Sequence, residues 1–356
     1  MASLAKTLLV KAITLVVVLI GVLVLLAVIM GATGLSDKML NSILTSEVQE
    51  YKQQLLRQGK DIAAIEKAVE EFKKERAAAL GIDRPWYERM PQLIYRLLVL
   101  DLGNSRTLQS SWGSNKIADL ILDRLPNTII LTTTGILFTA LVGIWMGLYI
   151  GANIGSRADR VVSILSAASY ALPLWFVGLV LILVLAYGPK ILWGVQTFPP
   201  GGMVSTPPPK EPLAYVLDVM WHLSLPLFAS FIVFFGSWAY TTRNIVFSVS
   251  QEDFVNFARA KGLPEDMVRN RYILRPSLPP ILTSLILSLA GSISGYIITE
   301  RVFNWPGMGS LFYSAITALD EPVIFALTYV FTLVYIIARF ILEILYVLLD
   351  PRIRLS

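Results

Sequence analysis

The sequence predicts an all-α polytopic membrane protein with six transmembrane helices. Three observations predict it: 55% of the 356 residues are hydrophobic, only 15% are charged, and the charges are clustered so that long apolar segments remain between them. A soluble domain carries about 25% charged residues, and a helix needs about 20 mostly apolar residues to cross a bilayer. There are no cysteines, which excludes disulfides, thiolate metal sites and a cysteine nucleophile.

Six segments are apolar and long enough to span. They are residues 12–30, 129–150, 161–187, 223–242, 281–299 and 323–342. In the third segment, Pro173 followed by Trp175 predicts a break in the helix. The first five segments carry no ionisable side chain in their cores, whereas a proton- or ion-coupled transporter usually keeps such groups near the membrane midplane. The pattern therefore indicates an energy source on another chain.

Basic residues set the expected orientation, because Lys and Arg are enriched in short cytoplasmic loops. Four flanking regions that six spans place on one side are all basic, through Lys6, Lys11, Arg157, Arg160, Arg259, Lys261, Arg269, Arg271, Arg275, Arg352 and Arg354, whereas the short loops on the other side carry few positive charges. We therefore expect both termini in the cytoplasm and a helical extracytoplasmic insertion between the first and second spans. The first span is longer than the 7–15 apolar residues typical of a cleaved signal sequence, so we expect a retained signal-anchor helix.

The expected topology divides the chain into four parts. These are a signal-anchor span at 1–33, an extracytoplasmic helical segment at 34–126, a five-helix permease core at 127–350 with an inner loop at 243–280, and a cytoplasmic tail at 351–356. The external segment is predicted to be helical because apolar residues recur at helical spacing from Ile62 to Phe72, and Glu70 and Lys74 form an i,i+4 pair. Asp83 is expected to cap a further helix with Pro85 in its first turn.

The sequence contains no recognisable catalytic signature. No glycine-rich loop is followed by Lys and Ser or Thr, and no nucleophile elbow, zinc-binding helix or paired-carboxylate pattern is present. We therefore expect no catalytic residue, no metal site and no cofactor bound by this chain. The single histidine, His222, lies beside a tryptophan at a span entrance, which favours an interfacial side chain over a proton relay.

Uncharged polar side chains follow one face of the fifth span. Ser284, Ser288 and Ser292 are four residues apart, and Gly291 and Gly295 have GxxxG spacing. One interpretation is close helix packing with hydroxyl groups bonding across the interface. The other is a translocation path for a polar, uncharged solute, for which the candidate lining residues are Tyr170, Trp175, Ser288, Ser292 and Tyr296.

The loop before the fifth span has internal organisation. The segment "EDFVNFARAKG" predicts a short helix that ends at Gly262, a Gly-Leu-Pro turn follows, and "EDMVRNRYIL" predicts a second short helix before Pro276. Two short helices across the inner surface would fit a groove on a partner protein. Ala258, Ala260 and Gly262 are small, which permits close backbone contact. The basic charge of the loop alone is explained equally well by the preference of positive residues for the cytoplasmic side.

The stretch "EDFVNFARAKGL…LRPSLPP" closely resembles the cytoplasmic "EAA" loop of permeases of ATP-binding-cassette importers, in particular the dipeptide/oligopeptide/nickel subfamily. "LGIDRPWYERM", "LDLGNS", "ITERVFNWPGMGSL" and "LDPRIR" are also similar to segments of that subfamily, in the same order, from about Leu80 to Arg354. The segment after the first span departs from it, because a long charged helix replaces the usual Pro-Gly-Asp-Pro. Tyr272 stands where a histidine is common, and Asn256 and Phe257 occupy the "EA" positions.

The resemblance implies a permease in the plasma membrane of a bacterium or archaeon. Its partners would be a second homologous permease, two ATPase subunits that bind ATP and Mg, and an extracytoplasmic solute-binding protein, with no nucleic acid. The ATPase-coupling residues would be Asp253, Phe254, Phe257, Ala258, Arg259, Ala260, Lys261, Gly262, Leu263 and Pro264. The binding-protein docking and external-gate residues would be Trp86, Glu300, Phe303, Trp305 and Pro306.

We therefore expect the permease subunit of an ATP-driven importer for a small oligomeric solute, and not an enzyme. The hydroxyl-rich fifth span, the lack of intramembrane charge and the unusual segment after the first span favour an oligosaccharide, whereas the family favours an oligopeptide. A stand-alone secondary transporter or channel is the alternative, and it predicts transport by the chain alone. A membrane receptor or scaffold predicts that a bulky residue at position 262 leaves uptake unchanged.

Overall fold

A computed structural model describes residues 2–58, 62–291 and 296–349, and its regular structure in this part of the chain is helical. Six helical segments are long and apolar enough to cross a membrane: Leu9–Ala32, Ile117–Ala152, Leu174–Trp193, Pro212–Ser250, Glu265–Leu289 and Glu321–Ile341. The predicted all-α fold with six spanning helices is confirmed. Contacts divide the chain into two compact units, Met1–Leu120 with Ser314–Ser356, and Ile121–Tyr313.

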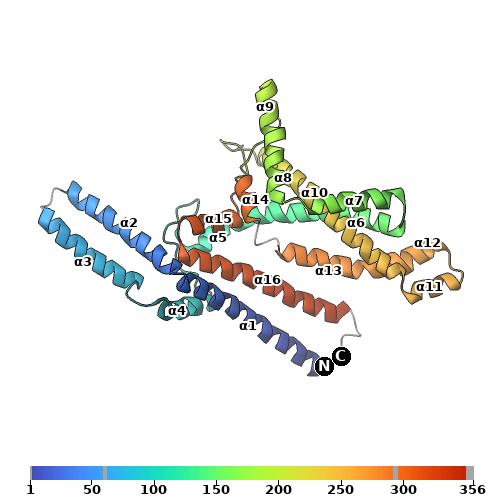
Figure 1. Cartoon of the computed structure of the whole chain (residues 1–356), viewed down its shortest axis with the longest axis horizontal. Helices are drawn as coiled ribbons and strands as arrows, with labels where there is room; N and C mark the ends of the chain where they lie inside the picture. The colour runs from blue at the N-terminus through green and yellow to red at the C-terminus, as the bar shows by residue number, and fades with distance from the viewer. Residues whose placement is uncertain (1, 59–61, 292–295, 350–356) are drawn as a thin grey trace. The chain divides into compact units, whose positions relative to one another are not determined.

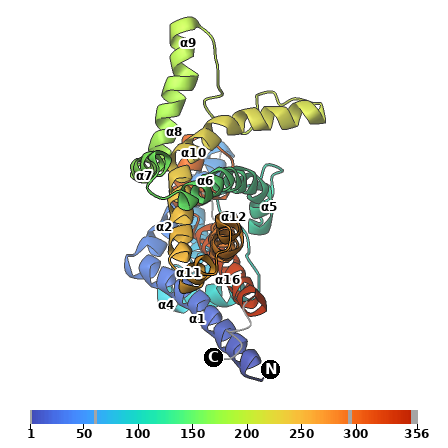
Figure 2. The same cartoon turned by 90° about the vertical axis from the view of Figure 1, so that its right-hand side faces the viewer.

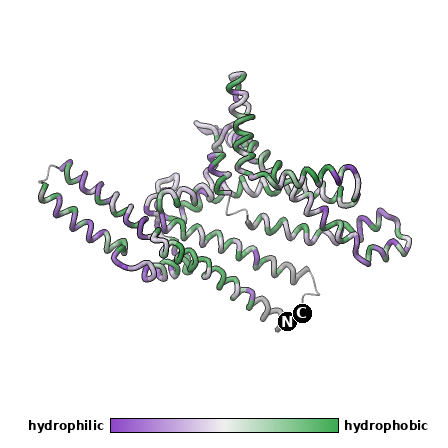
Figure 3. The backbone as a smooth tube through the Cα atoms, viewed as in Figure 1, coloured by the Kyte–Doolittle hydropathy of each residue, from purple (hydrophilic) through white to green (hydrophobic). Residues whose placement is uncertain are grey.

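The first unit contains two spanning helices and the segment that follows the first of them. Its main helices are α1 (Ala2–Ala32), α2 (Leu35–Arg57), α3 (Ile62–Leu80), α4 (Trp86–Leu98) and α16 (Glu321–Leu349). The first and last of these pack against each other, so the sixth span groups with the first by contacts. Figure 1 shows α2 and α3 side by side as a hairpin, and Figure 3 shows that hydrophilic residues gather along it.

Specific side chains hold the α2–α3 hairpin together. The Arg76 guanidinium donates to the Glu47 carboxylate at 2.5 Å, and the rings of Tyr51 and Phe72 stack with centroids 4.4 Å apart. The predicted Glu70–Lys74 pair is present at 3.3 Å. The predicted cap by Asp83 is wrong: Pro85 occupies the N-cap of α4 without a side-chain cap, because its extended backbone already ends the preceding turn.

The second unit is built around α10 (Pro212–Ser250), a single 39-residue helix that is longer than the predicted span. It contains Pro226, and Figure 2 shows the helix changing direction along its length. A proline removes one helical hydrogen bond and is a usual cause of such a bend. The continuous segment α5 (Ile117–Thr128), η1 (Ile129–Thr133) and α6 (Thr134–Ala152) brings its last helix against α10.

Glycines make the contact between α6 and α10 close. Gly143, Gly147 and Gly151 recur every four residues on α6, so they form one stripe. A Cβ atom on any of them would collide with α10, at Trp238, Thr242 and Val246 respectively. Small residues at this spacing let two membrane helices approach closely and gain van der Waals contact. The stripe therefore fixes α6 against the half of α10 that leads to the inner loop.

The third predicted span is divided in two. The predicted break at Pro173 is confirmed, since it separates α7 (Arg157–Tyr170) from α8 (Leu174–Leu181), η2 (Ile182–Tyr187) and α9 (Gly188–Trp193). The prediction of one span over residues 161–187 is wrong, because only Leu174–Trp193 is long and apolar enough. The cause is local: Pro173 adopts an extended backbone with ψ 133° and begins α8 as its N-cap.

The inner loop contains one separate helix, not two. The first, α11 (Asp253–Ala260), stands alone. The predicted second helix continues into the fifth span as α12 (Glu265–Met267), η3 (Val268–Leu274) and α13 (Arg275–Gly291), so the prediction of two short surface helices is wrong. Pro276, Pro279 and Pro280 lie near the start of α13, and the π-helical segment η3 directly precedes them. The remaining helices are α14 (Ile297–Val302) and α15 (Met308–Thr317).

Candidate functional site

Helix α11 ends in the turn that the sequence predicts. Gly262 follows its C-cap with φ +75°, a left-handed conformation that favours glycine. The Gly262 N–H donates to the Arg259 carbonyl at 2.9 Å, and the Leu263 N–H donates to the Ala258 carbonyl at 3.4 Å. Pro264 then begins α12 as its N-cap. The helix, the glycine turn and the change of direction are thus encoded locally.

One face of α11 is buried against its own chain. Val255 and Ala258 lie in an apolar cluster with Val246 of α10 and with Val268 and Ile273. Ala258 is only 2% exposed. Its small side chain therefore lets α11 approach the permease itself, and the expected contact of Ala258 with a partner is not available in this structure.

The other face of α11 is exposed and aromatic. Phe254 is 43% exposed and Phe257 is 62% exposed. The Lys261 Nζ lies 4.6 Å from the centroid of the Phe257 ring, a distance at which a cation attracts an aromatic face. Asp253, Ala260, Gly262 and Pro264 are exposed and Leu263 is half-buried. The loop thus presents an exposed aromatic surface, formed by Phe254 and Phe257, with Lys261 at its edge.

Arg259 is engaged within the loop. Its guanidinium forms an ion pair with the Glu265 carboxylate at 3.0 Å, which connects α11 to the start of α12 across the Gly262 turn. The expectation that Arg259 meets an acidic residue of a partner therefore competes with this internal pair. Lys261, whose described contact is with the Phe257 ring, remains the basic residue nearest to the aromatic surface.

An ion pair between the buried Asp159 and the half-buried Arg243 joins α7 to α10 close to the inner loop, and sequence reasoning missed it. The Asp159 carboxylate accepts from Arg243 Nε at 2.9 Å and from Arg243 Nη2 at 3.0 Å. It also accepts from the Gly155 N–H at 2.9 Å. The guanidinium is the main cause that lowers the pKa of Asp159. A signal did exist, since Asp159 is the one acid in the basic stretch 153–160.

Two cavities lie on α10. The first has a volume of about 400 Å³ and is lined by Ile136, Thr139, Phe234, Ser237, Trp238, Thr241, Ser284, Ser288 and Tyr296. The second has a volume of about 740 Å³ and is lined by Ser163, Ile164, Ser166, Ala167, Tyr170, Gly236, Ser237, Tyr240 and Thr241. Ser237 and Thr241 line both. None of these lining residues is charged, and hydroxyl groups provide most of their polar atoms.

The structure brings together part of the predicted path. Ser288 and Tyr296 line the first cavity, with the Tyr296 ring stacked on Phe234 at 5.9 Å, and Tyr170 lines the second. Trp175 lines neither and contacts Phe176 edge to face. Ser292 lies outside the described residues. The sequence analysis missed hydroxyl groups on α6, α7 and α10, namely those of Thr139, Ser163, Ser166, Ser237, Tyr240 and Thr241.

Glu300 is the centre of a second buried polar group. It is fully buried, and its carboxylate accepts from Thr128 Oγ1 at 2.9 Å and from the Ser310 N–H at 2.8 Å. The Gly309 N–H is a further donor. These donors are all neutral, so desolvation dominates and burial raises the pKa of Glu300 to about 7. The loop after α14 is thereby fixed to the end of α5.

Buried aromatic side chains pack beneath the loop that follows α14. Phe303 is buried in the core formed by α8 and α10. Trp305 is buried beside Leu131 and donates from its indole Nε1 to the Asn127 carbonyl at 2.8 Å. Pro306 is half-buried, and its carbonyl accepts from Asn127 Nδ2 at 2.8 Å.

Three of the five residues predicted for docking and the external gate lie inside the structure, and their role stays a prediction. Glu300, Phe303 and Trp305 are buried, so their side chains build the loop and do not form its surface. A protein that docks here contacts the loop they shape, not the side chains themselves. Trp86, in the first unit, is half-buried, with its ring against Gly31 of α1.

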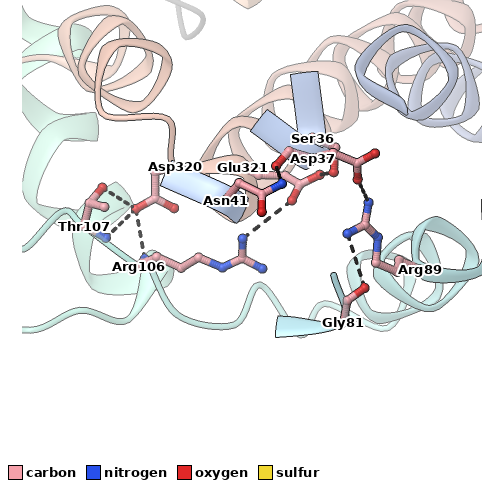
Figure 4. Close-up of polar contacts among 9 residues, drawn as sticks. All are labelled: Ser36, Asp37, Asn41, Gly81, Arg89, Arg106, Thr107, Asp320 and Glu321. Atoms are coloured by element: carbon pink, nitrogen blue, oxygen red, sulfur yellow. Dashed lines mark hydrogen bonds and ion pairs between the residues drawn. The ribbon is translucent and has the colours of Figure 1, made fainter. Parts of the chain in front are cut away.

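The first unit has its own polar centre at the start of α16 (Figure 4). One oxygen of the buried Asp320 carboxylate accepts from the Arg106 and Thr107 backbone N–H groups, at 2.9 and 2.8 Å, and from two hydroxyl groups. Glu321 accepts from Ser36 Oγ at 2.6 Å and lies 3.6 Å from the Arg106 guanidinium. These contacts anchor the segment before α5 and the start of α2 to the sixth span.

A comparison with protein families gives one match that covers more than half of the chain. Residues 140–355 match the family model described as "Binding-protein-dependent transport system inner membrane component". The matched region includes α10, α11 and the Glu300 loop. The α2–α3 hairpin lies outside it.

Individual relatives are similar over a longer stretch. The chain is 32% identical over 286 residues to the di/tripeptide transport system permease protein DppB of Pseudomonas aeruginosa, covering 77% of this chain and 83% of the relative. It is 31% identical over 290 residues to the probable D,D-dipeptide transport system permease protein DdpB of Escherichia coli, covering 77% and 82%. It is 29% identical over 273 residues to the oligopeptide transport system permease protein AppB of Bacillus subtilis, again covering 77% and 82%.

Proposed function

The chain belongs to the family of binding-protein-dependent transport system inner membrane components, and on this premise we propose that it passes a short peptide from an extracytoplasmic binding protein into the cytoplasm. It is a multi-pass permease of the plasma membrane in an ABC importer. ATP hydrolysis in such an importer lies on separate subunits. The chain itself is therefore not an enzyme.

The exposed face of α11 carries the proposal that this helix is the contact to the ATPase. Phe254 and Phe257 are two aromatic side chains on an eight-residue helix whose opposite face is already packed. Aromatic side chains are enriched at the centres of protein interfaces, where they supply most of the binding energy. A cleft on an ATPase subunit would bury both rings, with Lys261 at the edge of the contact. ATPase closure would then displace α11.

The proposed assembly follows from this contact. Two ATPase subunits, each with ATP and Mg, would lie on the cytoplasmic side, where the basic loops of the chain are expected. A second homologous permease would complete the translocation path. The segment 34–126 and the loop shaped by Glu300 would face the binding protein on the other side.

A peptide is the proposed solute because the relatives named above are permeases for oligopeptides, di/tripeptides and D,D-dipeptides. The two cavities on α10 offer hydroxyl groups that can bond to peptide amides, and their described lining carries no charge. Fixed charges there would select particular side chains. A neutral lining suits a permease that relies on its binding protein for selection.

A neutral oligosaccharide is the second candidate, and the same lining favours it. Hydroxyl groups such as that of Ser288 can bond to sugar hydroxyls, and aromatic side chains such as Tyr170 and Tyr296 provide flat apolar surfaces. A zwitterionic peptide carries two terminal charges that this lining does not neutralise. The two candidates therefore differ in charge: the terminal charges of a peptide must be neutralised outside this lining, whereas a neutral oligosaccharide has none.

Reconstitution decides between them. The chain is placed in lipid vesicles with the permease, ATPase and binding protein encoded beside it, and uptake of labelled di- to tetrapeptides and of neutral oligosaccharides is measured. We expect peptide uptake that requires both ATP and the binding protein. Uptake of sugars alone would favour the second candidate. Uptake by the isolated chain without any ATPase would overturn the proposal in favour of a stand-alone transporter.

A substitution in the loop tests the role of α11 in the same vesicles. Gly262→Trp places a bulky side chain at the end of α11, and we expect uptake to be lost with the protein still in the membrane. Gly194→Trp, at the C-cap of α9, is the matched control, because both glycines have positive φ and open space around them. Equal loss in both variants would trace the effect to backbone strain, and unchanged uptake in Gly262→Trp would fit a receptor or scaffold.

A further inference from the structure

We propose that the Asp159–Arg243 ion pair is the link that transmits movement of α11 to the helices around the larger cavity. This inference rests on the proposed function, because it assumes that ATPase subunits move α11. Arg243 and Asp159 are thus positioning residues, which act on transport through the helices that they join. The argument has three steps: the geometry of the pair, the contacts of α7 with α10, and the path from α11 along the chain.

Several contacts fix the geometry of the Asp159–Arg243 pair. Two parallel hydrogen bonds of 2.9 and 3.0 Å join the guanidinium to both carboxylate oxygens, and such a bidentate pair fixes orientation as well as distance. Asp159 is further held by the Gly155 N–H, and its own N–H donates to Ser156 Oγ at the start of α7. The Arg243 guanidinium also lies 5.5 Å from the ring centroid of Phe247. Both partners are therefore fixed to their own helices.

Helices α7 and α10 touch at a second point. Gly236 of α10 lies against Ser166 of α7, so closely that a Cβ atom on the glycine would collide with it. Ser166 is seven residues from Asp159, and Gly236 is seven residues from Arg243. The helices thus run antiparallel, with contacts about 10 Å apart along both axes. Ser163 and Tyr240 lie between the two contacts in sequence, and both line the larger cavity.

Helix α10 connects this arrangement directly to α11. Only Gln251 and Glu252 separate the end of α10 at Ser250 from the start of α11 at Asp253. Val255 and Ala258 also share an apolar cluster with Val246 of α10, one turn beyond Arg243, and with residues of η3, which contacts both helices. A displacement of α11 therefore moves the end of α10. Because the ion pair holds α7 to α10, α7 moves together with the end of α10. Without the pair, α7 could slide along α10 at the Gly236 contact, where the glycine has no side chain that would interlock the two helices.

The test measures how much peptide is taken up for each ATP hydrolysed. Asp159→Asn and Arg243→Gln each remove one charge, and the double variant D159N/R243Q leaves no unpaired charge. In the reconstituted complex we expect the ratio of peptide uptake to ATP hydrolysis to fall about tenfold, a usual size for the coupling between two sites. ATPase activity and co-purification of the ATPase should be retained. A purely structural role would lower both activities together.

Two further variants keep the proposal open to refutation. Arg243→Lys preserves the charge but not the bidentate geometry, so an intermediate ratio is expected. The exchanged pair D159R/R243D should regain part of the wild-type ratio. A wild-type ratio in D159N/R243Q, or equal loss of uptake and ATP hydrolysis in all variants, would overturn the proposal. If the wild-type complex hydrolyses no ATP when the loaded binding protein is added, the proposed function fails instead.

Discussion

Two buried carboxylates in the unit Ile121–Tyr313 are stabilised in opposite ways. Asp159 meets an arginine, and the guanidinium lowers its pKa. Glu300 meets only neutral donors, and burial raises its pKa to about 7. Asp159 lies in the first turn of α7 and Glu300 lies in the short helix α14. Each holds together two parts of the chain that are distant in sequence. Asp159 faces a charged guanidinium, whereas Glu300 faces neutral donors and is the more deeply buried of the two.

The difference concerns what each site can do. A carboxylate paired with arginine stays charged over the whole physiological range, so it makes a permanent mechanical link. A carboxylate surrounded by neutral donors exchanges its proton near neutral pH. The Asp159 region is therefore suited to transmit force, whereas the stability of the Glu300 region depends on pH.

Removing the arginine should give the largest loss of stability. Arg243→Leu leaves Asp159 buried without its counter-charge, and breaking a buried pair in this way costs about 3–5 kcal/mol. We expect a clearly lower unfolding temperature in detergent at neutral pH. The deficit should shrink as the pH is lowered, because a protonated Asp159 no longer needs a counter-charge. In the wild type, the contribution of the pair is fully present above the usual Asp pKa and is lost as pH falls from there through the lowered pKa of Asp159.

The Glu300 region should show the next largest effect, with the opposite pH dependence. Its pKa is near 7 in the folded protein against 4.5 in a free side chain. The folded state therefore binds more protons between these values, and stability falls as pH rises, by about 3 kcal/mol in total at 1.4 kcal/mol per pKa unit. Glu300→Gln should remove this dependence. The free energies of unfolding of the wild type and of Glu300→Gln at about pH 5.5 and 8.5 test this. An equal dependence on pH in the two proteins would contradict it.

Packing around Glu300 supplies a third, smaller effect. A Cβ atom on Gly307 would collide with the Glu300 carboxylate and with Thr128 Oγ1. Gly307→Ala should therefore cost about 1–3 kcal/mol, the usual range for overpacking. Gly21→Ala is the matched control, because Gly21 lies in helix α1 with nothing within 4 Å of an added Cβ. An equal change in the free energy of unfolding of the two variants would contradict this, because it would mean that the loop shifts to make room for the added Cβ atom.

The exposed pair of α11 should give the smallest effect. Glu265→Ala removes the partner of Arg259, and both side chains are largely exposed. Solvent and salt screen such a pair, so the unfolding temperature should stay unchanged within error at low and at high salt. A large drop would show that the loop depends on this pair, and the contrast with Asp159 and Arg243 would then lose its basis.

Local signals explain what the sequence predicts well. The spans follow from apolar length, the break in the third span follows from Pro173, and the end of α11 follows from Gly262. Each of these depends on a few neighbouring residues, as do the helices of the α2–α3 hairpin. The proline cluster after Leu274 misled the prediction, because the helix continues from η3 into α13 where prolines usually mark a boundary.

Long-range contacts explain what the sequence does not reveal. Asp159 and Arg243 are 84 residues apart, and Thr128 and Glu300 are 172 apart. Neither pairing has a periodicity or spacing that a single sequence displays. The burial of Ala258 has the same origin, since an alanine on a short amphipathic helix suits either a partner or the helix's own chain. Only the packing of α11 against η3, in the cluster that it shares with Val246 of α10, decides between them.

Site-specific crosslinking from α11 tests the central claim most directly. The chain has no native cysteine, so a single introduced cysteine can carry a photoreactive maleimide. Ala260 is exposed and Ala258 is buried, which makes Ala260→Cys and Ala258→Cys a matched pair two residues apart. The account predicts that illumination joins the Ala260→Cys chain to an ATPase subunit and leaves the Ala258→Cys chain free. Peptide uptake without any crosslink from Ala260→Cys to the ATPase would contradict it.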